Sequence, residues 1–279
     1  MDFTDMLANI AQRAAASTPP EPGDYQENGL LFCGKCHTAK QSVIQLDEKV
    51  VTVSCLCKCR SEAWEKERQE SKRIELQDKA ERLRDACFKG SKLSSWTFEA
   101  DDGRIPRIME IIHRFVDNFP ELYSGGHGLL LYGERGNGKT FAAACAVNAL
   151  ISQGKPCVMT NFSQIATQMM GLRDSKWEYM DRLFGCSLLA IDDLGAERDT
   201  EYMNEIIFSV IDGRYRAKRP MIITTNLSMD EIKHPRDMAQ GRVIDRILER
   251  CAPVEVKGPN LRRQNIVKEY PRIKELLGI

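Results

Sequence analysis

Four short apolar runs recur in the second half of the chain, each bounded by glycine or polar residues. They occupy positions 128–133, 157–162, 187–193 and 221–226 and read GLLLYG, CVMTNF, SLLAIDD and MIITTN. The longer stretches between them suit amphipathic helices. Apolar strands that alternate with helices are typical of a parallel sheet covered on both faces, because parallel strands need long crossovers. The pattern predicts an α/β domain over residues 95–279.

The stretch before that domain has a different pattern. From position 62 to 84 the sequence EAWEKERQESKRIELQDKAERLR is rich in charge and free of glycine and proline, which favours a helix. Its apolar positions are too sparse to form a wide buried stripe. We expect a charged helical linker over residues 62–94, either solvated on most sides or in coiled-coil contact with a partner.

Two further segments precede the linker. Residues 1–29 contain an alanine-rich piece and then STPPEPGD, whose prolines and glycine end any helix, so we expect a tail there. Residues 30–61 contain CGKC, the β-branched stretch SVIQLDEKVVTV and then CLCKC. Strands rich in β-branched residues between two groups of cysteines predict a small hairpin module.

Charge and cysteine content narrow the partners and the compartment. The chain has 279 residues with 40 Lys plus Arg and 40 Asp plus Glu, so its formal net charge of +0 predicts no attraction of the whole molecule to nucleic acid or membranes. We do not expect disulfides among the ten cysteines, because the N-terminus lacks the pattern of a secretory signal and the cytosol is reducing. No run approaches the roughly 18 apolar residues that span a bilayer. We expect a cytoplasmic protein with no membrane partner.

A phosphate-binding loop follows the first apolar run. The sequence GERGNGKT lies between a predicted strand and a predicted helix, which is the context that a P-loop requires. Its glycines let successive N–H groups face the phosphates of ATP, and the helix adds the positive end of its dipole. Lys139 should reach the β- and γ-phosphates and Thr140 should ligate magnesium; a plain glycine turn is the alternative. The nucleotide-binding residues are Gly133, Glu134, Arg135, Gly136, Asn137, Gly138, Lys139 and Thr140.

Polar side chains end two of the other apolar runs. Asp192 and Asp193 end SLLAIDD, and Asn226 ends MIITTN. Because the carboxyl ends of parallel strands share one edge of the sheet, these side chains should meet the nucleotide. We expect Asp192 to hold magnesium through water, Asp193 to orient the attacking water as general base, and Asn226 to sense the γ-phosphate. The alternatives are an acid pair that caps a helix and an asparagine that only makes a turn.

The N-terminal cysteines have the spacing of a metal site. Cys33 and Cys36 form a CxxC pair, and Cys55, Cys57 and Cys59 follow across the hairpin. Four thiolates suffice for tetrahedral zinc, and we choose Cys57 and Cys59 over Cys55 because they lie nearest the predicted helix. The expected ligands are therefore Cys33, Cys36, Cys57 and Cys59, with His37 as a spare candidate.

Other chemistry remains open for these thiols: a redox pair, an iron–sulfur cluster or unconnected core thiols. A module this small cannot form an adequate apolar core, so a bound metal would contribute most of its folding energy. The other five cysteines lie in expected core elements. We expect buried thiols at Cys87, Cys145, Cys157, Cys186 and Cys251.

The P-loop, the acid pair and TTN stand in the order and at the spacing of AAA+ ATPases. The sequence over roughly residues 96–256 resembles the DnaC/DnaI family of replicative-helicase loaders, most closely in LLLYGERGNGKTFAAACAVNALI, in LLAIDDLGAERDTEYMNEIIFSVIDGRYRAKRPMIITTNL and in GRVIDRILERC. The resemblance implies the fold of an AAA+ P-loop NTPase that uses ATP and Mg²⁺. It also implies that the N-terminal part grips a hexameric replicative helicase.

The resemblance assigns arginines as well. It implies an arginine finger at Arg246 that reaches the ATP of a neighbouring subunit, hence a homo-oligomer when ATP is bound, and a sensor arginine at Arg262. Arg242 competes for the finger, and the alternative for both residues is pairing with acids on a surface helix. Two positions depart from the family pattern: Leu261 replaces the usual aromatic residue, and Asp193 replaces the glutamate of many AAA+ proteins. The shorter Asp193 predicts slow hydrolysis.

By the same resemblance, additional helical sequence after the second strand lines a channel for single-stranded DNA. In this chain the segment is 163–184, with Arg173, Lys176, Trp177 and Arg182 as backbone and stacking contacts. The alternative is an ordinary amphipathic helix whose cations are merely exposed.

These expectations combine into one function. We expect an ATP-dependent loader that places a replicative DNA helicase on single-stranded DNA when replication starts, with a slow ATPase activity that its partner or DNA stimulates. The rival functions are a transposition helper ATPase, a small-molecule P-loop kinase and a nucleotide-gated scaffold.

Overall fold

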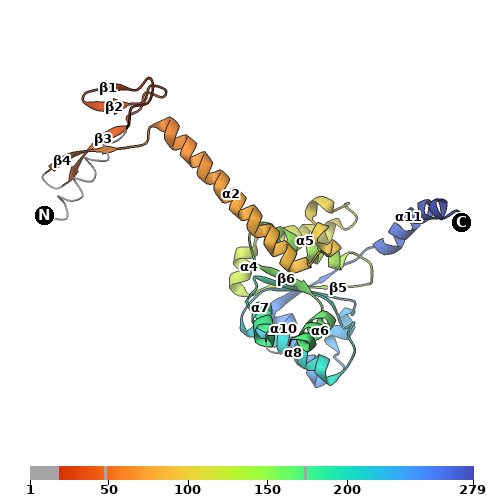
Figure 1. Cartoon of the computed structure of the whole chain (residues 1–279). Coiled ribbons are helices and arrows are strands. Elements are labelled where there is room, and N and C mark those ends of the chain that lie inside the picture. Colours follow the sequence, from red (N-terminus) through yellow and green to blue (C-terminus); the bar gives the residue numbers. More distant parts are fainter. Residues whose placement is uncertain (1–18, 47–48, 173–174) are drawn as a thin grey trace. The chain divides into compact units, whose positions relative to one another are not determined.

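The chain divides into two compact units, one up to Glu75 and the other from Leu76 onward. A computed structural model describes residues 19–46, 49–172 and 175–279 (Figure 1). Helix α2 (Lys58–Phe88) crosses the division between the units. None of the helices in these described ranges is long and apolar enough to cross a membrane.

Two antiparallel hairpins form the first unit ahead of α2. Asn28 and Gly29, with φ of 51° and 78°, make a two-residue turn between the first pair of strands, as Asn-Gly favours. This hairpin begins inside residues 1–29, where the sequence pattern predicts only a tail, whereas the second hairpin matches the predicted one. The strands β1, β2, β3 and β4 span Tyr25–Glu27, Leu30–Phe32, Gln41–Leu46 and Lys49–Ser54.

Helix α2 begins four residues before the predicted linker, so Cys59 lies in its first turn. Its buried residues are Ala80, Cys87 and Phe88, all in the C-terminal part, which agrees with the sparse apolar pattern. Lys89 and Gly90 follow with φ of 46° and 75°, and this left-handed backbone ends the helix.

A five-stranded parallel sheet forms the second unit, with the strand order β6-β7-β8-β5-β9. Four of its strands are the four predicted apolar runs. The fifth, β9, was not predicted because its sequence CAPVE contains a proline and exposed residues, which suit an edge strand. The strands span Gly128–Tyr132 (β5), Cys157–Thr160 (β6), Leu188–Leu194 (β7), Met221–Thr225 (β8) and Cys251–Glu255 (β9).

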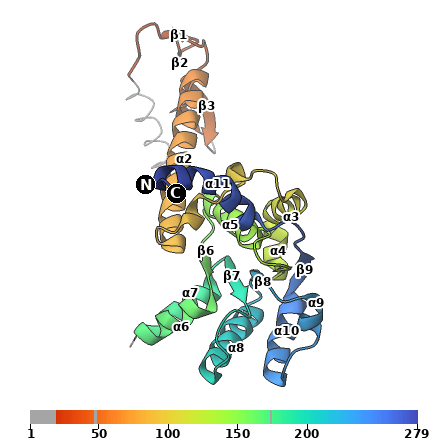
Figure 2. The same ribbon diagram turned by 90° about the vertical axis from the view of Figure 1, so that its right-hand side faces the viewer.

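Helices cover both faces of this sheet and create two apolar cores. Alternate strand residues face opposite cores: Leu129 and Leu131 join the core under α3 and α5, and Leu130 joins the core under α6, α8 and α10. Figure 2 shows these helix groups on opposite sides of the sheet. The helices span Pro106–Asp117 (α3), Phe119–Gly125 (α4), Lys139–Ser152 (α5), Phe162–Gly171 (α6), Lys176–Gly185 (α7), Glu201–Arg216 (α8), Met229–Lys233 (α9), Met238–Arg250 (α10) and Leu261–Leu277 (α11).

The segment expected to line a DNA channel is helical, as predicted, and it folds as two helices, α6 and α7. The connection contains positions 173 and 174, so Arg173 lies outside the described residues. Two short 3₁₀ helices, Lys92–Ser95 and Phe98–Ala100, connect α2 to α3.

A fully buried arginine joins α8 to the end of α7 and to the residues that precede β7 and β8. Arg214 is 0% exposed, and its Nη1 donates to the carbonyls of Leu183, Phe184 and Cys186 at 3.2, 2.9 and 2.7 Å. Its Nη2 donates to the carbonyl of Pro220. Burial lowers the pKa of this guanidinium, yet four carbonyl partners compensate much of the desolvation.

Replacing this arginine should destabilise the second unit strongly. Arg214→Met would leave the four carbonyls without their donor, and we expect the free energy of unfolding to fall by roughly 3–5 kcal/mol in urea denaturation. Arg216→Met is the matched control, because the side chain of Arg216 is 75% exposed; its effect should stay within about 0.5 kcal/mol. Equal effects of the two substitutions would contradict this role of Arg214.

Candidate functional site

The loop between β5 and α5 curls through three glycines. Gly133, Gly136 and Gly138 have φ of 136°, 83° and 96°, a region that side-chain-bearing residues avoid. Helix α5 begins at Lys139, as the sequence predicts, so its free N–H groups face the space above the loop. The backbone therefore offers a binding place for phosphates.

The loop lysine points back into its own loop. Lys139 Nζ donates to the carbonyls of Gly133 and Glu134 at 2.8 and 2.7 Å, and to Asn137 Oδ1 at 3.3 Å. Lys139 is only 5% exposed, and this burial lowers its pKa. An ammonium group held among loop carbonyls is placed to meet an anion that the loop N–H groups bind.

The carboxylate of Asp192 connects the loop to two strands. Its Oδ1 accepts a hydrogen bond from Thr140 Oγ1 at 2.9 Å and another from Thr224 Oγ1 at 2.6 Å. Burial raises the pKa of Asp192, although these two hydrogen bonds oppose the shift. Thr224 lies within β8 and was not predicted, because the pattern MIITTN singles out only its last residue, Asn226.

The next residue, Asp193, has a special backbone conformation. Its φ of 55° lies in the left-handed region, and its N–H donates to Thr224 Oγ1 at 2.9 Å. Asn226 Nδ2 donates to Asp193 Oδ1 at 3.3 Å. The three polar residues expected at the carboxyl edge of the sheet are therefore brought together.

A cavity of about 650 Å³ opens beside these residues. Gly133, Glu134 and Asp192 lie behind its wall, where they contact Lys139 or Thr140. The predicted residues that line it are Arg135, Gly136, Asn137, Gly138, Lys139, Thr140, Asp193, Asn226 and Arg262.

Part of the cavity wall lies outside the predicted nucleotide-binding residues. Trp96 and Ile105 come from the irregular segment before α3 and belong to no motif. Leu261, named from the sequence only as a departure from the family pattern, comes from the start of α11. The ring of Trp96 lies 5.8 Å from that of Phe141, between ring centroids. These side chains offer an apolar surface of the kind that a nucleotide base requires.

Arg104 connects the two walls of the cavity. Its Nη1 donates to Asn265 Oδ1 at 2.8 Å, and its Nη2 lies 2.5 Å from Asp102 Oδ2. The segment before α3 and the first turns of α11 are thereby held together across the opening.

The C-terminal segment also contacts the loop itself. The N–H of Leu261 donates to the carbonyl of Gly136 at 2.8 Å, and Asn137 Nδ2 donates to the carbonyl of Val256. A Cβ atom at Gly136 would come within 2.4 Å of Asn260 Oδ1. The glycine is therefore needed for close packing as well as for its φ.

The two finger candidates lie on α10, outside the lining of this cavity. Arg246 Nε donates to Asp212 Oδ1 at 2.8 Å, so it does pair with an acid in the isolated chain. Arg242 is exposed, and its guanidinium makes no hydrogen bond or ion pair that is recorded among the described residues. Near the possible DNA contacts, Trp177 is 79% exposed, whereas Arg182 Nη2 donates to the carbonyl of Ala86.

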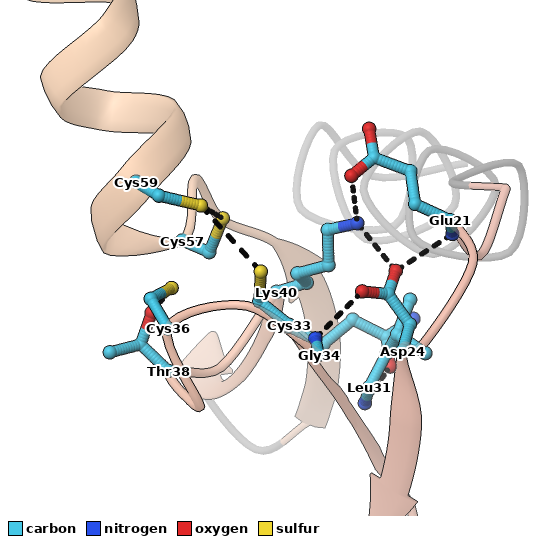
Figure 3. Close-up of polar contacts among 11 residues, drawn as sticks. Glu21, Asp24, Leu31, Cys33, Gly34, Cys36, Thr38, Lys40, Cys57 and Cys59 are labelled. Carbon is cyan, nitrogen blue, oxygen red and sulfur yellow. Dashed lines mark hydrogen bonds and ion pairs between the residues drawn. The ribbon is translucent and has the colours of Figure 1, made fainter.

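Four cysteines of the first unit converge. Cys33, Cys36, Cys57 and Cys59 place their sulfur atoms within 4.8 Å of one another. The Sγ of Cys59 lies 3.6 Å from that of Cys33 and 3.4 Å from that of Cys57 (Figure 3). Tetrahedral zinc with Zn–S bonds of about 2.3 Å requires sulfurs about 3.8 Å apart, so the donor set fits zinc.

Two other candidates stay outside this sulfur group. Cys55 is exposed, and its Sγ contacts the carbonyl of Ala39 at 3.4 Å. His37 is likewise not among the grouped residues.

Within the group, a hydrogen bond between Cys36 Sγ and Thr38 Oγ1, 3.1 Å long, lowers the pKa of Cys36 to about 5.

A buried ion pair supports the same module. Asp24 accepts from the N–H groups of Glu21 and Gly34 at 2.8 and 3.0 Å, and Lys40 Nζ lies 2.5 Å from its Oδ2 (Figure 3). The hydrogen bond from Lys40 is the main cause that lowers the pKa of Asp24 to about 2. The Asp24–Gly34 contact connects the segment before β1 to the CxxC turn. Asp24 lies within residues 1–29, which the sequence pattern predicts to be a tail.

The remaining cysteines are buried, as predicted. Burial raises the pKa of the thiols Cys87, Cys145 and Cys251 to about 12, and it raises the pKa of Cys157 and Cys186 as well. They are core residues rather than reactive thiols.

The chain matches a known family of ATP-binding proteins. The sequence model of a family described as IstB-like ATP binding proteins matches residues 80–269, well over half of the chain. The chain belongs to this family. The match includes the whole sheet, the phosphate loop and the acid pair, and the strand order is that of an AAA+ P-loop fold.

The relatives of this IstB-like chain include replication proteins. The replicative helicase loader DnaI of Bacillus subtilis (strain 168) is 27% identical over 206 residues, which cover 68% of this chain and 66% of that protein. The replicative helicase loader DnaC of Escherichia coli (strain K12) is 29% identical over 119 residues, or 41% of this chain and 47% of that protein. The matched regions thus span less than two thirds of these relatives.

One solved structure supports the fold of the second unit. The crystal structure of a DNA replication initiation factor aligns with a TM-score of 0.51 at 21% identity, covering 64% of this chain and 55% of that one. A crystal structure of DnaI covers 64% of this chain and 92% of its own, at 25% identity and a TM-score of 0.46. The first of these two structures supports only the AAA+ fold and no shared function.

Matched cysteine substitutions test the sulfur group. Cys57→Ala removes one of the four converging sulfurs, so purified protein should lose its zinc, about one ion per chain by elemental analysis, and the module should unfold at lower temperature. Cys55→Ala should retain both zinc and stability, because Cys55 lies outside the group. Zinc loss in Cys55→Ala but not in Cys57→Ala would show that the ligands were misassigned.

Proposed function

We propose that this chain is an ATP-dependent loader of a hexameric replicative DNA helicase onto single-stranded DNA. The observation that carries the proposal is a complete set of nucleotide-site residues in a chain whose curated relatives are named replicative helicase loaders. The loop N–H groups and Lys139 bind the ATP phosphates. The apolar wall with Trp96 and Ile105 receives the base.

Magnesium would be held directly by Thr140 and through water by Asp192. Hydroxyl and carboxylate oxygens are the hard ligands that this ion prefers, and these two groups lie within hydrogen-bond distance of each other, so the residues fit the ion. When bound, magnesium neutralises charge on the phosphates. Burial raises the pKa of Asp192, and such a cation would oppose this rise because it stabilises the charged carboxylate.

Asp193 is the proposed general base. Its backbone is fixed by the hydrogen bond to Thr224, and the amide of Asn226 holds one of its carboxylate oxygens. Asn226 can therefore couple the position of this base to the γ-phosphate, and Arg262 adds a cation at the cavity wall. Hydrolysis is slow, because the short side chain of Asp193 reaches less far toward the phosphate than a glutamate would.

A neighbouring copy of the chain supplies the arginine finger. We assign it to Arg246 and keep Arg242 as the alternative, since both lie on α10 away from the cavity of their own chain. A finger provided in trans makes the ATP-bound form a homo-oligomer. The zinc module grips the helicase, and Lys176, Trp177 and Arg182 contact single-stranded DNA.

The base is tested by Asp193→Asn. We expect ATP binding, measured by fluorescent-nucleotide titration, to change less than about threefold, and phosphate release to fall about a hundredfold or more, because the amide cannot accept a proton. Asp199→Asn, in the exposed loop that follows, should leave both measurements unchanged. Undiminished phosphate release in Asp193→Asn would exclude this residue as the base.

Two substitutions in different units test the division of labour. Lys139→Ala should bind no ATP yet capture the helicase of its own host or phage as well as wild type does, whereas Cys57→Ala should bind ATP and lose the helicase. Both proteins are immobilised as full chains and the captured helicase is quantified. Loss of helicase capture in Lys139→Ala would contradict the proposal.

The same preparations separate the rival functions. Capture of a transposase instead of a helicase would favour a transposition helper, and turnover stimulated by a metabolite but not by DNA would favour a small-molecule kinase. ATP-dependent helicase capture with no phosphate release in wild type would favour a nucleotide-gated scaffold.

A further inference from the structure

An almost buried carboxylate on α8 faces the proposed arginine finger. The side chain of Asp212 is 10% exposed, and its Oδ1 accepts from Arg246 Nε at 2.8 Å. Its other oxygen, Oδ2, lies 2.5 Å from Nη2 of Arg216, an arginine whose side chain is 75% exposed. One carboxylate thus holds one partly enclosed arginine and one solvated arginine.

The guanidinium of Arg246 lies over two aromatic rings. Its central carbon lies 4.8 Å from the ring centroid of Phe208 and 5.7 Å from that of Tyr215. Its Nη1 donates to the carbonyl of Arg242 at 3.2 Å, while no partner of its Nη2 is recorded among the described residues. The Nε edge is therefore fixed, and the Nη2 end stays free to bind an anion.

Other contacts besides the ion pair hold α8 and α10 together. Tyr215 already donates its hydroxyl to the carboxylate of Glu249 at 2.9 and 3.0 Å, and the apolar residues Val243, Ile244 and Ile247 are buried in the core that these helices share. A carboxylate that holds one edge of an arginine, beside rings that fix its plane, removes most of the rotamer freedom of a long side chain.

We propose that Asp212 is the positioning residue of the arginine finger, which it aims at the ATP of the neighbouring subunit. This inference rests on the proposed function, because it assumes that Arg246 acts in trans. Asp212 does not touch the nucleotide; it holds Nε so that the Nη2 end reaches the phosphate without a search through rotamers.

Single substitutions give the first test. Asp212→Ala should lower ATP turnover of the assembled full chain about tenfold to a hundredfold, and Asp212→Asn, which keeps an oxygen but loses the charge, should lie between it and wild type. ATP affinity at concentrations where the chain is monomeric should stay within about twofold of wild type. Arg216→Gln, which alters the solvated partner of Asp212, should retain wild-type turnover.

Subunit mixing separates positioning from a merely structural role. A Lys139→Ala subunit binds no ATP but carries an intact finger, and an Arg246→Ala subunit binds ATP but lacks the finger. Mixing these two should restore turnover that neither has alone. Asp212→Ala should likewise regain turnover when mixed with Lys139→Ala, and it should regain none when mixed with Arg246→Ala, because both then lack a working finger.

The outcomes are distinct. If Lys139→Ala and Arg246→Ala fail to restore each other, the finger in the proposed function is wrong and the role of Asp212 falls with it. If they succeed but Asp212→Ala keeps wild-type turnover, complements Arg246→Ala, or fails to complement Lys139→Ala, only the positioning role is overturned.

Discussion

The partly buried carboxylate of Asp192 is the junction on which the nucleotide site depends. It accepts hydrogen bonds from Thr140 at the start of α5 and from Thr224 on β8, while it lies itself on β7. These elements can meet only because β8 lies between β5 and β7 in the sheet. The strand order therefore decides the chemistry: a different order would separate the phosphate loop from its acids.

The chain draws on two sources of stability. The second unit has two apolar cores around one sheet, with Arg214 satisfying the carbonyls where strands and helices end. The first unit has short hairpins and few buried residues; a metal held by its four converging sulfurs would add to the stability that the Asp24–Lys40 pair contributes. Because these sources are independent, a change in one unit need not unfold the other.

Much of the site could be predicted from local sequence. The phosphate loop needs glycines at fixed positions between a strand and a helix, and Asp192, Asp193 and Asn226 follow apolar runs, so one-dimensional patterns suffice for them. The four cysteines that converge are the four predicted as zinc ligands, and Cys55 lies outside their group.

The rest depends on contacts between distant segments. Arg104 meets Asn265 across 161 positions, and neither residue belongs to a motif. Asp212 meets Arg246 across 34 positions, and the family resemblance assigns a role only to Arg246. Strand β9 carries a proline at the edge of the sheet, where the usual signals of a strand are weak. The Asn28–Gly29 turn did carry a signal, but the prolines before it favoured a tail.

Nucleotide binding at this site should control helicase loading. This control is measured by the amount of helicase retained on circular single-stranded DNA after a salt wash, with the purified wild-type chain and with or without ATP. Helicase should be retained only when the chain and ATP are both present. Equal retention without ATP, or without the chain, would show that nucleotide binding does not control loading.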